Sequence, residues 1–163
     1  MSHSQEERRW RGESRSLSRR ELEAFLAKPW VARLATLGDD GAPYISTLWY
    51  EYEPPVFYLV GRAKSQWVRN LLRDNRVALH VADDDPPHTR VLVRGKAEIL
   101  GGPTAIQGKW VELATRMATK YLGTRGREYL IPTMNRKRYW IRVRPNKVIT
   151  WTGIEWHPKY TSA

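Results

Sequence analysis

The stretch VFYLVGRAKSQWVRNLLR, residues 56–73, holds a strand, a basic turn and a helix in direct succession. Residues 56–60 are β-branched, aromatic or aliphatic, which is typical of a strand. In residues 64–73, Trp67 and Leu71 lie on one face at helical spacing, with Val68 beside them. The segment between them, GRAKSQ, is therefore predicted to join the end of a strand to the start of a helix.

This junction has the chemistry of an anion site. The start of a helix exposes unpaired backbone N–H groups, and the helix dipole places partial positive charge there. Arg62 and Lys64 add two full positive charges, and Ser65 adds a hydroxyl that can cap the helix or donate to an oxyanion. The arrangement suits a phosphate group. The alternative is a solvated basic loop in which Ser65 simply caps the helix.

A strand over residues 43–52 precedes this segment and is rich in β-branched and aromatic residues. Strand alternation places Ser46 and Leu48 on one side and Thr47 and Trp49 on the other. A flat ligand can rest against such a strand and accept hydrogen bonds from its backbone. The alternative is that the aromatic residues pack the wall of a barrel.

A helix start lies further toward the N-terminus. Ser18 and Glu21 form the pattern of a capping box, and Leu17 with Leu22 forms a hydrophobic staple. The remaining expected elements are helices over residues 18–27 and 103–122 and strands over residues 30–37, 76–82, 90–100, 138–144 and 147–151. Short antiparallel hairpins of this kind predict a mainly β fold: a small barrel with flanking helices, which leaves few edges exposed.

The length and composition limit the class of protein. The chain has 163 residues and a mass of 19.1 kDa, enough for one domain over residues 18–157 with a basic extension at 1–17 and a tail at 158–163. It has no cysteine, which excludes disulfides, thiolate metal sites and a cysteine nucleophile. No apolar run approaches the ~20 residues that span a bilayer. We therefore expect a cytoplasmic protein without a membrane partner.

The positive charge requires an explanation. The net charge is +11, so the chain attracts polyanions. In the strand over 138–144, alternation places Arg138, Trp140, Arg142 and Arg144 on one face, where they could grip a polyanion while Trp140 stacks on a ring. A nucleic-acid-binding barrel is therefore a competing hypothesis. The non-functional alternative is an edge strand whose charges protect it from aggregation.

The sequence lacks the common catalytic motifs. Its four histidines show no metal-ligand spacing, so no metal site is expected. It has no glycine-rich nucleotide motif, no nucleophile elbow and no evident acid–base pair. If the protein is an enzyme, a bound cofactor is expected to supply the chemistry.

Four blocks in a fixed order carry a family resemblance. They are WVARLATLGDDGAPYISTLWY (30–50), VFYLVGRAKSQWVRNLLRDNRV (56–77), VLVRGKAEIL (91–100) and RYWIRVRPNKVITW (138–151). Together they resemble the pyridoxamine 5′-phosphate oxidase-like split barrels, and among these the deazaflavin-associated group. The resemblance implies a six-stranded antiparallel split barrel, a homodimer with two flavin-type cofactors at its interface, and an oxidoreductase that acts on a small organic substrate.

The resemblance also implies a set of cofactor-binding residues. The strand from Ser46 to Trp49 corresponds to the strand along the cofactor's ring and ribityl chain, and the turn at residues 62–65 corresponds to the phosphate site. Arg90 corresponds to a polar contact, and Trp151 to an aromatic residue given by the partner subunit. The complete implied set is Ser46, Thr47, Leu48, Trp49, Tyr58, Leu59, Arg62, Ala63, Lys64, Ser65, Arg90 and Trp151.

Two departures bear on the reaction and the cofactor. Ser46 and Glu51 stand where true pyridoxamine phosphate oxidases have an arginine and a lysine, so oxidation of vitamin B6 is not expected. Coenzyme F-420 has a longer anionic tail than FMN, and the arginine-rich residues 125–144 can meet it. F-420 is therefore the favoured cofactor and FMN the alternative. A carrier protein that binds the cofactor without turnover is a third hypothesis.

Overall fold

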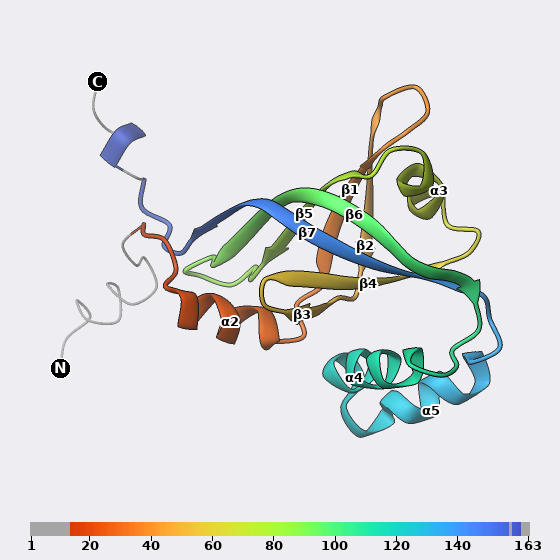
Figure 1. The fold of residues 1–163 in the computed structure, drawn as a ribbon. Coiled ribbons are helices and arrows are strands. Elements are labelled where there is room, and N and C mark those ends of the chain that lie inside the picture. Colours follow the sequence, from red (N-terminus) through yellow and green to blue (C-terminus); the bar gives the residue numbers. More distant parts are fainter. Residues whose placement is uncertain (1–13, 157, 161–163) are drawn as a thin grey trace.

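The computed structural model describes residues 14–156 and 158–160 (Figure 1). The helices are α2 (Arg19–Ala27), α3 (Gln66–Arg73), α4 (Trp110–Leu122) and α5 (Gly126–Leu130), with short 3-10 turns at Gly123–Arg125, Ile131–Thr133 and Pro158–Tyr160. The strands are β1 (Ala32–Leu37), β2 (Pro43–Leu48), β3 (Glu51–Glu53), β4 (Val56–Arg62), β5 (Arg76–Ala82), β6 (Arg90–Thr104) and β7 (Arg138–Trp151). No helix among the described residues is long and apolar enough to cross a membrane.

The seven strands form one antiparallel sheet in the order β2-β1-β5-β6-β7-β4-β3. β2 and β3 are the two edges of this sheet, yet only Trp49 and Tyr50 separate them along the chain. The sheet must therefore curl until its edges meet, and the barrel is split at this seam. Counted with β2 and β3 as one interrupted strand, the sheet has six strands, and the predicted mainly β split barrel is confirmed.

The interruption at the seam corrects the prediction of one continuous strand over residues 43–52. Side chains from α4 take over the hydrogen bonds of Tyr50 at this point. The Tyr50 N–H donates to Tyr121 Oη at 3.1 Å, and the Tyr50 carbonyl accepts from Lys120 Nζ at 3.2 Å. Because these partners lie off the sheet, the backbone leaves the ladder at Trp49 and returns to it in β3.

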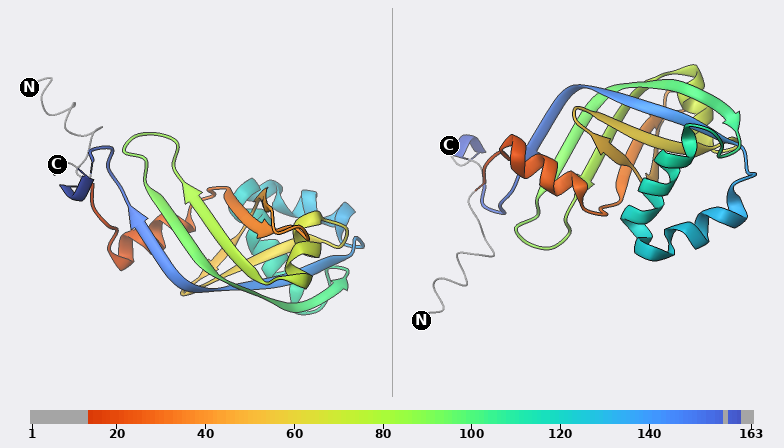
Figure 2. Two further views of the ribbon diagram at one scale, coloured as in Figure 1. Left: turned by 90° about the horizontal axis from the view of Figure 1, so that it is seen from above. Right: turned by 60° about the horizontal axis from the view of Figure 1, so that its bottom comes forward.

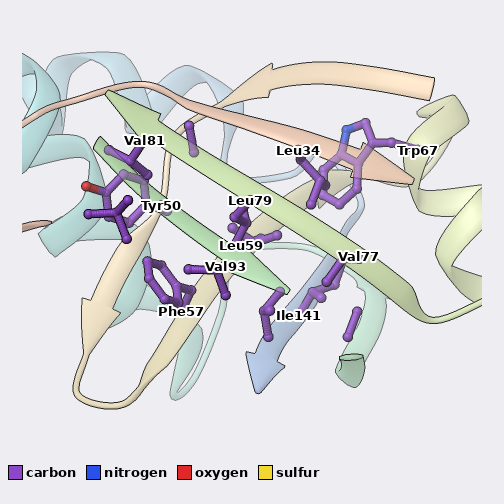
Figure 3. Close-up of a cluster of buried hydrophobic side chains, with 14 of the residues drawn as sticks. Leu34, Tyr50, Phe57, Leu59, Trp67, Val77, Leu79, Val81, Val93 and Ile141 are labelled. Carbon is purple, nitrogen blue, oxygen red and sulfur yellow. The ribbon is translucent and has the colours of Figure 1, made fainter. Parts of the chain in front are cut away.

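The main hydrophobic core fills the inside of the barrel (Figure 3). Alternate residues of each strand point inward, as in the buried–intermediate pattern of β1, β4 and β5. Helix α3 closes one side, where Trp67 and Val68 are buried. The largest fully buried side chains of this core include Tyr50, Phe57, Leu34, Leu59, Leu79 and Ile141.

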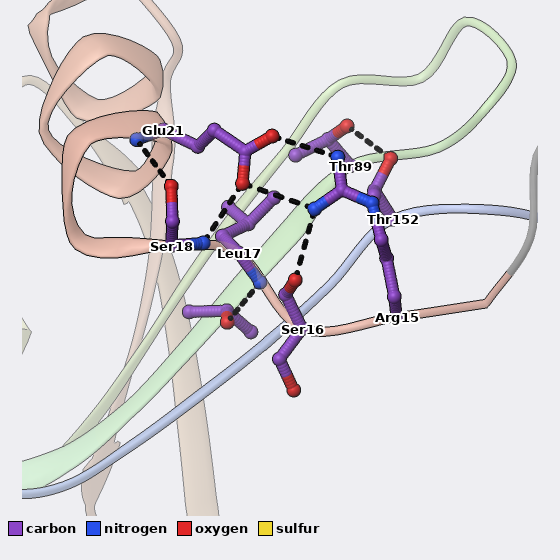
Figure 4. A network of polar contacts seen from close by, with 8 residues as sticks. Arg15, Ser16, Leu17, Ser18, Glu21, Thr89 and Thr152 are labelled. Carbon is purple, nitrogen blue, oxygen red and sulfur yellow. Dashed lines mark hydrogen bonds and ion pairs between the residues drawn. The ribbon is translucent and has the colours of Figure 1, made fainter.

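The segment before α2 is tied to the end of β7 (Figure 4). The predicted capping box is confirmed, since Glu21 N–H donates to Ser18 Oγ and Ser18 N–H donates to the Glu21 carboxylate. Arg15 binds the same carboxylate through two hydrogen bonds and pairs its backbone with Thr152. Residues 14–17 of the predicted extension thus lie against the barrel. Residues 1–13, 157 and 161–163, which include His3 and His157, lie outside the described residues.

The C-terminal strand is longer than predicted. The sequence predicts two strands separated by Pro145 and Asn146, whereas β7 runs without a break from Arg138 to Trp151. The strand continues through a β-bulge: Gly95 pairs with Pro145 and Arg94 with Lys147, so Asn146 has no partner in the β6–β7 ladder. Proline lacks the N–H of a regular ladder position, and a bulge tolerates this loss.

A second small core packs against α4, which lies with α5 at one end of the barrel in Figures 1 and 2. The sequence predicts a helix from residue 103, but β6 continues to Thr104, which pairs with Arg138, and α4 begins only at Trp110. Trp110 stacks on the fully buried Trp140, with ring centroids 4.8 Å apart. Helices α4 and α5 therefore lie together over one end of the barrel, beside the seam.

Candidate functional site

A cavity of about 690 Å³ lies between the seam of the barrel and helices α4 and α5. Its walls come from the end of β2, the ends of β4 and β7 and one face of α4. The lining residues are Val31, Ser46, Thr47, Leu48, Trp49, Val60, Arg62, Ser65, Trp67, Ile106, Ala114, Met117, Ala118, Tyr129, Leu130 and Arg138. The set includes two arginines and no carboxylate, so the cavity is positive in charge, and its walls combine apolar side chains with hydroxyl groups.

Trp49 forms an aromatic wall that α4 and α5 hold in place. Its ring stacks on Tyr121 at 4.8 Å between centroids and 3° between planes, and it meets Tyr129 at 5.5 Å in a tilted arrangement. The Tyr121 hydroxyl also donates to the Trp30 carbonyl at 2.8 Å. Because Tyr121 covers one face of Trp49, a ligand can reach only the remaining face and the edges of this ring.

The basic turn after β4 is partly as predicted. Arg62 and Ser65 line the cavity, whereas the exposed Lys64 does not. Ser65 is the first residue before α3, but its side chain makes no capping hydrogen bond. The Ala63 N–H donates to Lys137 O at 3.1 Å, and the Ser65 N–H donates to Arg62 O at 2.9 Å. Two of the expected free N–H groups are therefore used within the protein.

Other implied cofactor residues lie away from the cavity. The Leu59 side chain is fully buried in the barrel core, and Tyr58 packs against the small core under α4. Arg90 and Trp151 are ladder partners near the opposite end of β7, where the guanidinium lies 4.7 Å from the Trp151 ring centroid. A contact between Trp151 and a cofactor depends on a partner subunit and stays a prediction.

The predicted ring-stacking role of Trp140 on the face formed by residues 138–144 is wrong, although Arg138 of that face lines the cavity. Trp140 is fully buried against Trp110 and cannot stack on a ligand. Arg142 and Arg144 both bind the carboxylate of Glu98, at 2.8 and 3.2 Å. The alternation of the strand was correctly predicted, but the sequence did not reveal that α4 covers its first half.

Sequence reasoning did not single out the helical residues of the site, and it assigned Arg138 to a polyanion face and to a basic region for the F-420 tail. Met117 and Ala118 of α4 and Tyr129 of α5 line the cavity, together with Arg138 at the start of β7. The helical pattern of residues 110–122 was visible, but not the surface that it covers. Among the described residues, no group of three histidine or acidic side chains is placed to hold a metal ion.

Lys120, which binds α4 to the seam, makes the free energy of unfolding depend on pH. Burial lowers its pKa from 10.5 to about 8, although Glu51 nearby favours the charged form. Its ammonium donates to Leu26 O and Tyr50 O and lies 3.8 Å from the Tyr50 ring centroid. Between the two pKa values the unfolded chain holds a proton that the folded chain has released, so folding becomes more favourable as the pH rises.

We expect the free energy of unfolding to rise from about pH 8 to 10, by less than about 1.4 kcal/mol per unit because Lys120 is partly exposed. Above this range it should fall, since burial raises the pKa of Tyr50 and of Tyr121. Urea unfolding from pH 7 to 11 measures the profile. Lys120→Met should lack the rise, and an identical slope in both proteins would contradict the assignment.

The curled antiparallel sheet with its seam and flanking helices is a split barrel of the pyridoxamine 5′-phosphate oxidase-like type. Residues 18–152 match the sequence profile described as pyridoxamine 5′-phosphate oxidase, and the chain belongs to this family, which includes oxidoreductases. A comparison with curated proteins found no match.

Three solved structures show how widely the fold is used. An F-420 reductase is 30% identical, with a TM-score of 0.61 and coverage of 77% of this chain and 94% of that one. A conserved hypothetical protein from Mycobacterium tuberculosis is 25% identical, with a TM-score of 0.67 and coverage of 89% and 95%. A heme storage protein from Vibrio cholerae shares the fold at 15% identity, with a TM-score of 0.64 and coverage of 85% and 98%.

Proposed function

We propose that this protein is an oxidoreductase that binds a flavin-type cofactor, with coenzyme F-420 favoured over FMN, and acts on a small organic substrate. One observation carries the proposal: the cavity at the seam joins an aromatic wall to two arginines without any carboxylate in its lining. Its volume of about 690 Å³ lies within the usual range for ligand sites, roughly 300–1,000 Å³. An aromatic cofactor with a phosphate fits this combination.

Each wall has a separate task in this proposal. The backbone and side chains of residues 46–49 would lie along the ring system, with Trp49 fixed by Tyr121. Met117 and Ala118 of α4 would keep water from the opposite side. Arg62 and Ser65 would bind the phosphate. When bound, the cofactor supplies hydride transfer, and the protein supplies orientation and electrostatics.

The favoured cofactor rests on the F-420 reductase that is 30% identical and on the arginine-rich stretch 125–144, from which Arg138 lines the cavity. Heme is the competing ligand, because proteins of the same fold store it. Iron in heme is usually held by histidine, cysteine, methionine or tyrosine. The cavity lining contains Met117 and Tyr129 but neither described histidine, His80 or His88, so hemin is included as a competitor in the binding test.

We also propose that the protein acts as a homodimer. Ile45 on β2 is 69% exposed and Ile149 on β7 is 37% exposed, both on the outward face of the sheet. Ile149 shares its face with Trp151, since side chains two residues apart in a strand point the same way. A second copy on this face would cover these apolar side chains and bring Trp151 toward the partner.

Equilibrium binding tests the proposed function. The purified protein is titrated with F-420, FMN, hemin and a single-stranded oligonucleotide, with cofactor fluorescence, absorption and oligonucleotide anisotropy as readouts. We expect F-420 to bind most tightly and FMN next, with a shallow dependence on salt. Charge-driven oligonucleotide binding should instead weaken steeply, with a log–log slope of about −0.7 per phosphate.

Two results would reverse the proposal. Stoichiometric binding of hemin without binding of either flavin-type cofactor would make this a heme protein. Tight, salt-steep oligonucleotide binding without cofactor binding would favour the nucleic-acid hypothesis. A carrier would bind the reduced cofactor but fail to reoxidise it with any organic acceptor, whereas an oxidoreductase transfers the hydride.

A further inference from the structure

Arg62 and Arg138 lie directly opposite each other at the end of the β4–β7 ladder that borders the cavity. They are Cα partners in this ladder, and both line the cavity. Like charges directly opposite on neighbouring strands destabilise a sheet. Within the described part of the chain, neither arginine takes part in an ion pair. The pair thus concentrates positive charge where the protein itself supplies no counter-charge.

The guanidinium of Arg138 is held in a fixed position. Its Nη1 donates to Thr133 O at 2.8 Å and to Arg136 O at 2.7 Å, and its Nη2 donates to Thr133 Oγ1 at 3.0 Å. Thr133 itself is buried. These bonds use three of the five N–H donors of the guanidinium. The group is therefore oriented in advance and retains donors for an oxygen-rich ligand.

The surroundings of Arg138 disfavour an isolated positive charge. Burial lowers its pKa, and the nearby Arg136 and Arg62 add to this effect against the opposing influence of Tyr129. Removing a charge from water is costly unless a partner compensates it. A bound anion would offset both the desolvation of Arg138 and its repulsion from Arg62.

We propose that Arg62 and Arg138 form a two-arginine clamp for the phosphate of the cofactor, with Arg138 as its inner and fixed member. The ligand's identity rests on the proposed function, whereas the clamp rests on the geometry. Arginine suits this task because its planar fork binds phosphate through paired hydrogen bonds. The clamp differs from the expected pairing of Arg62 with Lys64: both side chains are exposed, but only Arg62 lines the cavity.

The test compares Arg138→Gln with Arg69→Gln, which removes an exposed arginine of α3 that does not line the cavity. Dissociation constants for F-420, FMN and phosphate-free riboflavin are measured by fluorescence, after circular dichroism shows that both variants are folded. Arg138→Gln should weaken F-420 and FMN about 10- to 150-fold and leave riboflavin unchanged. Arg69→Gln should change no affinity by more than about fivefold.

If Arg138→Gln loses affinity equally for FMN and riboflavin, Arg138 supports the cavity wall and the clamp is refuted. Unchanged affinities in this variant would also refute it. If the wild type binds none of the three ligands, the proposed function fails. The clamp is then tested separately, by measuring thermal stabilisation with inorganic pyrophosphate. Thermal stabilisation by pyrophosphate that is lost in Arg138→Gln would support it. No stabilisation of the wild type, or an equal shift in both proteins, would refute it.

Discussion

Trp140→Ala is expected to lower the free energy of unfolding by about 3–5 kcal/mol, the cost of deleting a fully buried aromatic side chain. Trp140 is completely shielded from solvent and stacks on Trp110, the first residue of α4. The cavity wall formed by α4 should move with it, so ligand affinity should fall as well. Urea unfolding and cofactor titration measure the two effects.

Trp156→Ala is the matched control, because this tryptophan is 74% exposed. It should change the free energy of unfolding by no more than about 0.5 kcal/mol, as is usual for surface substitutions. Similar losses in both variants would contradict the assignment of Trp140 to the core under α4.

Gly126→Val should separate α5 from α4. A Cβ atom at Gly126 would lie 2.7 Å from Ala118 C and 2.8 Å from Thr119 N, which are backbone atoms of α4 and cannot rotate away. Overpacking of this kind costs about 1–3 kcal/mol and sometimes more. Because Tyr129 and Leu130 of α5 line the cavity, we expect a loss of ligand affinity together with a lower unfolding midpoint.

Arg127→Ala is the control for this prediction, since Arg127 is the next residue of α5 and its side chain is exposed. It should leave both the unfolding midpoint and the affinity for FMN, which lacks the long anionic tail of F-420, close to those of the wild type. If Gly126→Val behaves like Arg127→Ala, the close contact between α4 and α5 is not required for the cavity.

The sequence was sufficient where neighbours along the chain determine the structure. The capping box at Ser18 and the strand–turn–helix order of residues 56–73 depend on local spacing, and both were predicted. Residues 46–49, Arg62 and Ser65 were assigned to one ligand site, and the structure brings them to one cavity. Their binding of a cofactor stays a prediction.

The parts that were not predicted depend on contacts between distant residues. The strand over residues 43–52 is interrupted because Lys120 and Tyr121 bind the backbone groups of Tyr50. No residue pattern within the strand predicts this interruption. Trp140 fits the polar face of its strand by alternation alone, but α4 covers it. Arg138 enters the cavity for the same reason, since the helices that complete the wall come from elsewhere in the chain.

The seam between β2 and β3 also fixes the order in which a growing chain can complete its fold. The N–H of Tyr50 finds its partner 71 positions later, in Tyr121. Until that residue has left the ribosome, β2 and β3 are barrel edges whose junction lacks these partners, and open strand edges invite pairing with other chains. Contacts between distant positions also slow folding. Tyr121 precedes β7 (Arg138–Trp151), which lies between β6 and β4 in the sheet, so the open edges of β6 and β4 are covered last, once all of β7 has been synthesised.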